Sequence, residues 1–117
     1  MTKRRQALGR SGEDLAVARL QALGYRIIER NYRSRLGEID LVARDGGRLV
    51  FVEIKTRLGP AEEAKAAVDR NKQRRLRRLA LSYMKEKGCP EAPCRFDVVA
   101  VGLASDRAQV QVIRNAF

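Results

Sequence analysis

The sequence contains no histidine and no tryptophan, and only two of its 117 residues are cysteine. Catalytic triads and proton shuttles that need an imidazole are therefore excluded, which leaves carboxylates, lysine, tyrosine, serine, threonine or a metal to do any chemistry. Cys89 and Cys94 supply too few ligands for a zinc site, and we expect free thiols. No apolar run reaches the roughly 18 residues of a membrane span. The basic start lacks the apolar stretch of a signal peptide, so we expect a cytoplasmic protein.

Acidic residues are scarce beside basic ones. Lysine and arginine total 25 against 14 aspartates and glutamates, a formal charge of +11. A polyanionic partner is the first expectation from such an excess. Aromatic residues make up 5% of the chain, which argues against recognition of single-stranded RNA by base stacking. A glycine-rich phosphate loop is also missing, so we expect no nucleotide cofactor.

The length fits one domain, residues 1–117, with a helix at its start. Ser11 is a candidate N-cap and Gly24 a stop signal, so the pattern predicts a helix over residues 11–24. Ala16 and Leu20 repeat at helical spacing, and Glu13 lies three residues before Ala16 on the same stripe. The helix therefore carries an acid at the head of its buried side.

The rest of the chain predicts strands on either side of a second helical region. In order, we expect a strand at 25–28, a basic turn at 31–37, strands at 38–42 and 48–55 joined by a hairpin turn at 45–47, a helical region at 61–87 with Val68 on its apolar side, and strands at 95–101 and 110–113. Whether residues 61–87 form one helix stays open. The nearly continuous hydrophobicity of 48–55 indicates a central strand. This order predicts an α/β fold with a mixed central sheet flanked by helices.

Two acids and a lysine occupy the interiors of the hairpin strands. Glu53 and Lys55 are two apart and must project from the same face, and Asp40 on the neighbouring strand can lie beside them. Buried carboxylates need a partner or a metal. Asp40 and Glu53 suit Mg²⁺, with Mn²⁺ as a substitute, and Lys55 can then orient a water; Glu13 can add a carboxylate through a bound water. A structural ion pair without metal is the alternative.

These residues, with others along the chain, resemble a known family. The acid on the first helix, the Asp on the second strand and Glu-x-Lys on the third look like the PD-(D/E)XK nuclease superfamily. More narrowly, the chain resembles the bacterial YraN-like family through Gly12-Glu13, Gly24-Tyr25, Arg30-Asn31-Tyr32-Arg33, Gly37-Glu38-Ile39-Asp40-Leu41, Phe51-Val52-Glu53-Ile54-Lys55-Thr56-Arg57, Lys72, Arg95-Phe96-Asp97-Val98 and Asn115-Ala116-Phe117. That family is similar in fold to archaeal Holliday junction resolvases.

The resemblance implies a restriction-endonuclease-like αβββαβ core and a set of site residues. It implies metal ligation by Asp40, Glu53 and the carbonyl of Ile54, a catalytic role for Lys55 and a supporting one for Glu13. Ile39 stands where the superfamily's signature has proline, and the loop between residues 57 and 64 is shorter than is common in the family.

Basic residues around the acids are candidates for binding nucleic acid. Arg33, Arg35 and Arg57 flank the acids in sequence and can clamp a phosphate. The second helical region carries a dense basic stretch that we expect to contact phosphates without reading sequence, although a solvated face is the alternative: Arg70, Lys72, Gln73, Arg74, Arg75, Arg77 and Arg78.

Together these features predict a Mg²⁺-dependent endonuclease acting on double-stranded or branched DNA. Cutting both strands of a branched substrate would suit a homodimer. The alternatives are a non-catalytic nucleic-acid-binding protein that keeps the nuclease fold, and a basic adaptor for an acidic protein. Tyr25, Tyr32 and Tyr83 are interpreted as packing residues, and Asp97 as a structural partner of Arg95 or of a loop amide.

Overall fold

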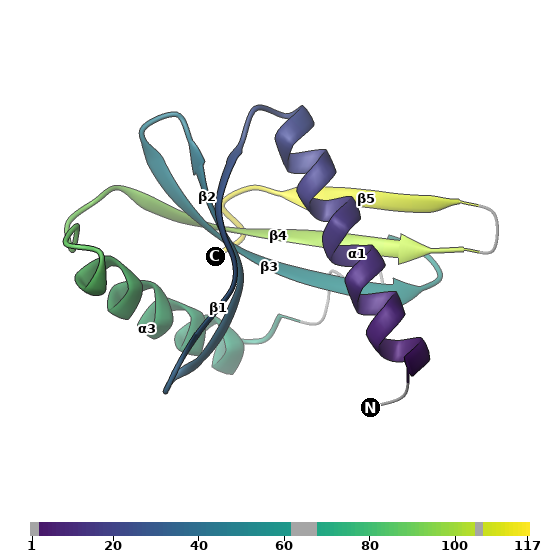
Figure 1. Cartoon of the computed structure of the whole chain (residues 1–117), viewed down its shortest axis with the longest axis horizontal. Coiled ribbons are helices and arrows are strands. Elements are labelled where there is room, and N and C mark those ends of the chain that lie inside the picture. The colour runs from purple at the N-terminus through teal and green to yellow at the C-terminus, as the bar shows by residue number, and fades with distance from the viewer. Residues whose placement is uncertain (1–2, 62–67, 105–106) are drawn as a thin grey trace.

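The computed structural model describes residues 3–61, 68–104 and 107–117. In these ranges two long helices and five strands follow one another (Figure 1). Their bounds are α1 Lys3–Ala22, β1 Arg26–Ser34, β2 Gly37–Asp45, β3 Arg48–Leu58, α3 Arg70–Glu86, β4 Cys94–Leu103 and β5 Ala108–Ile113. None of the helices in these ranges is long and apolar enough to cross a membrane.

The five strands form one mixed sheet in the order β1-β2-β3-β4-β5. Only the β3–β4 pair is parallel, and the other three pairs are antiparallel. Gly46 and Gly47 form the two-residue turn between β2 and β3, and Gly46 has a φ of 63°, a conformation that glycine adopts without steric cost. The predicted hairpin and the central position of β3 are both confirmed.

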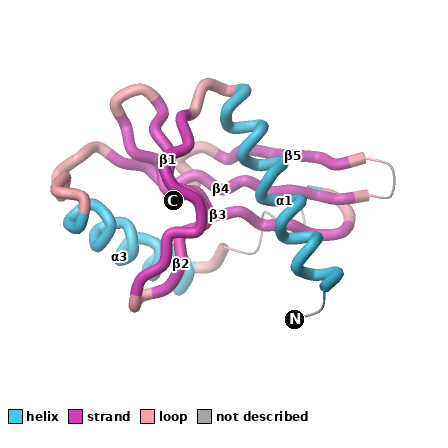
Figure 2. The backbone as a smooth tube through the Cα atoms, in the orientation of Figure 1, coloured by secondary structure: helices cyan, strands magenta, loops and turns pink. Residues whose placement is uncertain are grey.

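The helices cover opposite faces of this sheet (Figure 2). Ala16 and Leu20 of α1 pack on one face against the alternating apolar residues of β2, β3 and β4. Leu76, Leu79 and Tyr83 of α3 pack on the other face, in a cluster that includes Phe51 of β3. The structure thus confirms a mixed α/β fold with a central sheet flanked by helices.

Helix α1 begins earlier than the sequence predicted. It starts at Lys3, so Ser11 lies inside the helix and is not its N-cap. Residues 3–10 are rich in lysine, arginine, alanine and leucine, which have high helix propensity and carry the helix through Ser11 and Gly12. A side chain at Gly12 would collide with that of Thr56, so glycine allows α1 to approach β3 closely. The predicted end of the helix near Gly24 is confirmed, because α1 ends at Ala22 and Gly24 has a φ of 95° just beyond it.

Strand β1 is longer than predicted, and the expected basic turn at 31–37 is wrong. Residues up to Ser34 pair with β2, and only Arg35 and Leu36 remain between the two strands. An edge strand tolerates the charged and polar residues that read locally as a turn, and pairing with β2 overrides that local preference.

The second helical region is not one helix. Residues 62–67 lie outside the described part, but Val68 and Asp69 are non-helical, so the placement of Val68 on the apolar side of a helix is wrong. Asp69 is the N-cap of α3, and its carboxylate accepts a hydrogen bond of 2.9 Å from the backbone N–H of Lys72. Capping fixes where α3 starts, because it satisfies an otherwise unpaired amide of the first turn.

Candidate metal and phosphate site

The candidate site lies where β2 and β3 part. Pairing of these strands runs from Asp45 and Arg48 at the turn as far as Leu41 and Val52, whereas β3 continues beside β4 to Leu58. Asp40, one residue before Leu41, lies just beyond the last of these pairs. Its Oδ2 accepts a hydrogen bond of 2.8 Å from the backbone N–H of Ile54. A side-chain carboxylate therefore takes over the contact that a strand partner would have made, which holds Asp40 close to β3.

Glu53 and Lys55 project from β3 toward the α3 face. Phe51, two residues before Glu53, packs under α3 and shows which face this is. The Nζ atom of Lys55 lies 3.3 Å from Oε1 of Glu53, and the two side chains are only 18% and 14% exposed. The prediction that these two side chains project together is confirmed.

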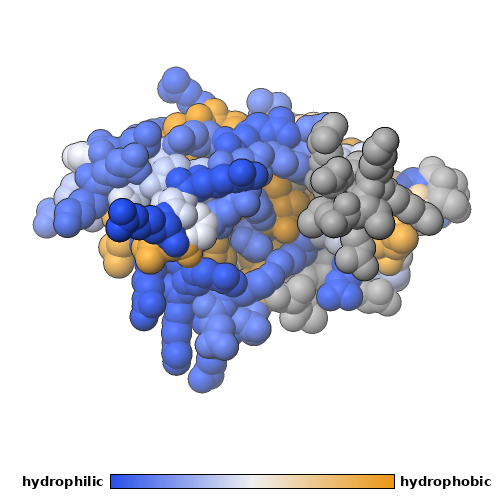
Figure 3. Space-filling model, turned by 60° about the horizontal axis from the view of Figure 1, so that its bottom comes forward, coloured by the Kyte–Doolittle hydropathy of each residue, from blue (hydrophilic) through white to orange (hydrophobic). Residues whose placement is uncertain are grey.

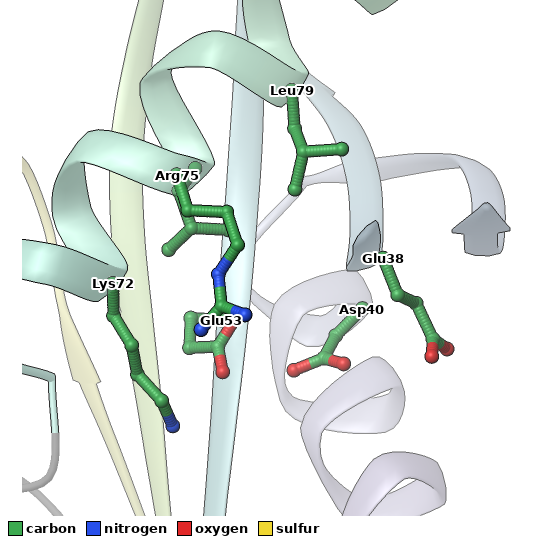
Figure 4. Close-up of a pocket in the computed structure, with 7 residues that line it drawn as sticks. Glu38, Asp40, Glu53, Lys72, Arg75 and Leu79 are labelled. Carbon is green, nitrogen blue, oxygen red and sulfur yellow. The ribbon is translucent and has the colours of Figure 1, made fainter. Parts of the chain in front are cut away.

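A pocket of about 230 Å³ opens between these acids and helix α3 (Figure 4). Its lining combines three acids from the sheet with two cations and two leucines from the helix: Glu38, Asp40, Glu53, Lys72, Arg75, Leu76 and Leu79. Figure 4 shows Asp40 and Glu53 side by side, with Lys72 and Arg75 reaching toward them from α3. Sheet and helix therefore contribute opposite charges to one hollow.

Burial and mutual repulsion disturb the titration of the acids. Desolvation, followed by the nearby charge of Glu53, raises the pKa of Asp40 from 3.8 to about 7, and the Ile54 N–H only partly opposes this. The folded protein therefore disfavours the ionised form of Asp40. A cation placed between Asp40 and Glu53 would relieve both the repulsion and the loss of hydration.

The two lysines of the site also affect each other. Contact with Lys55, followed by burial, lowers the pKa of Lys72. Burial disfavours the charged form of Lys55 as well, but contacts with Lys72, Glu53 and Asp40 outweigh it and raise the pKa of Lys55. Lys55 is thus held as an ammonium ion beside the carboxylates, and Lys72 is the more easily deprotonated of the pair.

The donor atoms fit a hard divalent cation. Asp40 and Glu53 offer carboxylate oxygens, the ligand type that Mg²⁺ takes, and Mg²⁺ usually keeps several waters beside one or two protein carboxylates. Within the described ranges no group of three or more acidic, histidine or cysteine side chains is arranged to hold a metal. Two protein carboxylates with open positions for water and phosphate match that preference. The ligand role of the Ile54 carbonyl stays a prediction.

Glu13 lies apart from this pocket. Its Oε1 accepts hydrogen bonds of 2.9 Å from Nε of Arg30 and 2.9 Å from Nδ2 of Asn31, both in β1. Asp14 shares the same arginine through a bond of 2.7 Å. Glu13 is therefore engaged in joining α1 to β1, and its supporting role in catalysis stays a prediction.

Glu38 is a charged residue of the pocket that sequence reasoning missed. It lies two positions before Asp40 on β2, which was a usable signal, because residues two apart on a strand share a face. Its carboxylate lies 3.8 Å from Nε of Arg33 in an exposed ion pair. Through its charge it also helps to raise the pKa of Asp40.

The predicted nucleic-acid-binding residues separate into groups in space. Lys72 and Arg75 line the acid pocket, and Arg74, Arg75 and Arg78 line a second hollow beside α3. Arg35, Arg57 and Arg70 are exposed, as is Arg33 in its ion pair with Glu38.

Two members of the basic stretch are engaged within the protein. The guanidinium of Arg77 lies over the rings of Phe96 and Phe117, at 5.5 and 5.6 Å. The side chain of Gln73 donates a hydrogen bond of 3.4 Å to the carbonyl of Val68 at the start of α3. Neither contact excludes a ligand, but both give these residues a role in packing or capping.

A buried network around Asp97 is structural, as predicted. Asp97 is fully buried and accepts hydrogen bonds from Nε of Arg95 at 3.0 Å, the Tyr25 hydroxyl at 2.7 Å and the backbone N–H of Asn115 at 2.9 Å. Arg95 continues to Asp45 at 2.7 Å. Tyr25 is 3% exposed, and Tyr32 and Tyr83 are also buried, in agreement with their interpretation as packing residues. Burial, followed by the bond to Asp97, raises the pKa of Tyr25.

Comparison with known proteins places the chain in a family. The model of the uncharacterised protein family UPF0102 matches residues 12–101. A UPF0102 protein of Symbiobacterium thermophilum is 53% identical over 116 residues, covering 94% of this chain and 95% of that protein. One from Moorella thermoacetica is 48% identical over the full length of both chains, and one from Geobacter sulfurreducens is 48% identical over 94% of this chain and 88% of its own length. The chain therefore belongs to the UPF0102 family, the YraN-like family that its motifs predicted.

Proposed function

We propose that this protein is a metal-dependent endonuclease of the PD-(D/E)XK type, which hydrolyses phosphodiester bonds of double-stranded or branched DNA with Mg²⁺ or Mn²⁺. The observation that supports this most is the pocket in which Asp40 and Glu53 meet two cations of α3, with Lys55 paired to Glu53 beside it. Carboxylates that are held together although burial raises the pKa of one of them are typical of a site arranged for chemistry. The overall charge of +11 supports a polyanionic substrate.

In this proposal each side chain has a defined task. When bound, a divalent cation would polarise the phosphate and lower the pKa of a water. Asp40 and Glu53 hold the cation, and the Ile54 N–H keeps the Asp40 carboxylate in place. Lys55 orients the attacking water. The water oxygen bonds to phosphorus as one ester bond breaks, which leaves a phosphate monoester on one strand end and a hydroxyl on the other.

Helix α3 supplies the complementary charge. Lys72 and Arg75 face the acids across the pocket, where they can hold the phosphate oxygens that a bound cation does not contact. Donors preset around the position where negative charge develops lower the barrier without reorganisation during the reaction. The acids alone would repel a phosphate, so the cations of α3 are as necessary to the proposal as Asp40 and Glu53.

A nucleic-acid-binding protein without catalysis is the second candidate. The distance of 3.3 Å between Lys55 and Glu53 favours it, because the same contact serves as a structural ion pair. Charge supports both candidates equally. Metal dependence separates them, since an ion pair needs no cation.

The test is cleavage of a four-way junction, a flap and a plain duplex at low salt with Mg²⁺ or Mn²⁺. We expect the wild type to cut, and Asp40→Asn and Lys55→Met to lose cutting while still binding DNA. Glu91→Gln, which changes an exposed loop acid, is the matched control and should cut normally. If the wild type binds all three substrates and cuts none, the binding protein replaces the nuclease as the better account.

A further inference from the structure

A second hollow, of about 330 Å³, lies between α3 and the β1–β2 turn. It is lined by Leu36 from the β1–β2 turn and by Asn71, Arg74, Arg75 and Arg78 from the helix. These four helix positions are spaced i, i+3, i+4 and i+7, so they share one side of α3. Figure 3 brings this lower side of the molecule forward and shows hydrophilic side chains projecting over the part that α3 occupies.

The lining of this hollow has one sign of charge. Three guanidinium groups and an amide face it, and the described lining includes no carboxylate. Like charges three and four residues apart on a helix repel one another, so their gathering destabilises α3 unless an anion offsets it. Guanidinium groups match the oxygens of a phosphate in bidentate geometry better than any other side chain.

Arg75 connects this hollow to the acid pocket, because it lines both. Its aliphatic stem packs against Gly37, where Cδ lies 3.6 Å from the position that a Cβ would take. The side chain therefore passes the start of β2, between the two spaces. A chain of phosphates entering the acid pocket would reach the hollow next.

The neighbouring Arg77 faces elsewhere and does not contribute to this lining. It stacks over Phe96 and Phe117 instead. The dense basic stretch is therefore divided by helix geometry into a side that lines the hollow and a side that packs on aromatic rings. Sequence density alone does not reveal this division.

We propose that Arg74, Arg75 and Arg78 bind a backbone phosphate of DNA adjacent to the one at Asp40 and Glu53. The identity of the ligand rests on the proposed function; the hollow itself does not. Arg75 then bridges two consecutive phosphates, and Arg74 and Arg78 hold the outer one. This interaction fixes the register of the strand in the acid pocket and carries no sequence preference.

The experiment measures DNA affinity without cleavage. Full-length protein binds a labelled duplex in EDTA, and the dissociation constant is followed across a salt series by fluorescence anisotropy. Arg74→Gln with Arg78→Gln removes two charges from the hollow. Arg44→Gln with Arg48→Gln removes two exposed charges near the β2–β3 turn, at the other end of these strands, and is the charge-matched control. Thermal melts check that each variant is folded.

We expect the hollow variant to lose about tenfold or more in affinity at low salt. The slope of log affinity against log salt should become shallower by about 1, because Arg74 and Arg78 share one phosphate and its charge loses most of its neutralisation. The control variant should keep most of the wild-type affinity and most of the wild-type salt slope. Arg74→Lys with Arg78→Lys keeps the charge and should recover the slope, with weaker binding because lysine cannot form the bidentate geometry.

Equal losses in the hollow variant and its control would overturn the proposal, as would a wild type that binds no DNA at low salt. The two proposals fail separately. Cleavage that depends on Asp40, combined with a hollow variant no different from its control, refutes only the hollow. Binding that depends on Arg74 and Arg78, in a protein that cuts nothing, supports the hollow and refutes the nuclease.

Discussion

Replacing Asp40 by asparagine should stabilise the metal-free protein at neutral and alkaline pH. A carboxyl group whose pKa rises from 3.8 to about 7 on folding destabilises the folded state by about 4 kcal/mol once it is ionised, since one pKa unit corresponds to 1.36 kcal/mol. The charge of Glu53 contributes to the rise, so the two carboxylates share this cost and about 4 kcal/mol is its upper limit. Asparagine keeps the shape of the group and can still accept from the Ile54 N–H.

The pH dependence follows from the direction of the shift. The folded protein binds the Asp40 proton more tightly than the unfolded chain, so the wild type loses stability as pH rises from about 3.8 to about 7. Above pH 7 this contribution is constant. Asparagine does not titrate, so the difference between the two proteins should be near zero at pH 4 and reach its full value by pH 8.

Thermal unfolding in EDTA from pH 4 to pH 8.5 measures this difference. With about 3 to 5 °C for each kcal/mol in a protein of this size, the variant should melt up to about 20 °C higher at pH 8. Added Mg²⁺ should narrow this difference by stabilising only the wild type, by about 2.7 kcal/mol at a hundredfold excess over its dissociation constant. A variant that is less stable than the wild type at pH 8 in EDTA, or a gain that is independent of pH, would refute the reasoning.

Two further predictions concern the scaffold. Asp97→Ala should destabilise the protein by about 3 kcal/mol in urea denaturation, because it leaves the buried guanidinium of Arg95 with only part of its compensation; a change below about 1 kcal/mol would show that Asp45 suffices. Gly102→Ala should destabilise by about 1–3 kcal/mol, because its Cβ would meet backbone atoms of Gly59, Pro60 and Ala61, which cannot move aside as a side chain can; unchanged stability would contradict this packing.

Local signals in the sequence were sufficient for the strands that build the site. The glycine pair at 46–47 and the β-branched runs on either side of it predicted the β2–β3 hairpin, and the alternation of side chains predicted that Glu53 and Lys55 share a face. Both follow from interactions close in sequence. Their physical basis, turn chemistry and the pleat of a strand, does not depend on the rest of the fold.

The parts that the sequence did not predict depend on distant partners. Residues 31–34 are polar enough to read as a turn, and only pairing with β2 makes them a strand. The sequence placed Glu13 on the buried stripe of its helix but could not show that Arg30 and Asn31 hold its carboxylate. Nor could it divide the arginines of α3 between the hollow and the aromatic rings, because that division needs the position of Phe117, forty residues further on.

The parting of β2 and β3 at Asp40 has a consequence for how this family can diverge. Up to Val52 the two strands pair through their backbones, whereas Glu53 and the residues after it pair with β4 and are held to β2 through the Asp40 carboxylate. A lineage can therefore exchange Glu53 without breaking a β2–β3 backbone pair, and can exchange Asp40 where the new side chain still accepts from the Ile54 N–H. At Asp40 an exchange to asparagine would even strengthen the fold, so asparagine would accumulate at this position unless selection acts on the carboxylate itself. Retention of both acids in a relative would then indicate that selection acts on these carboxylates.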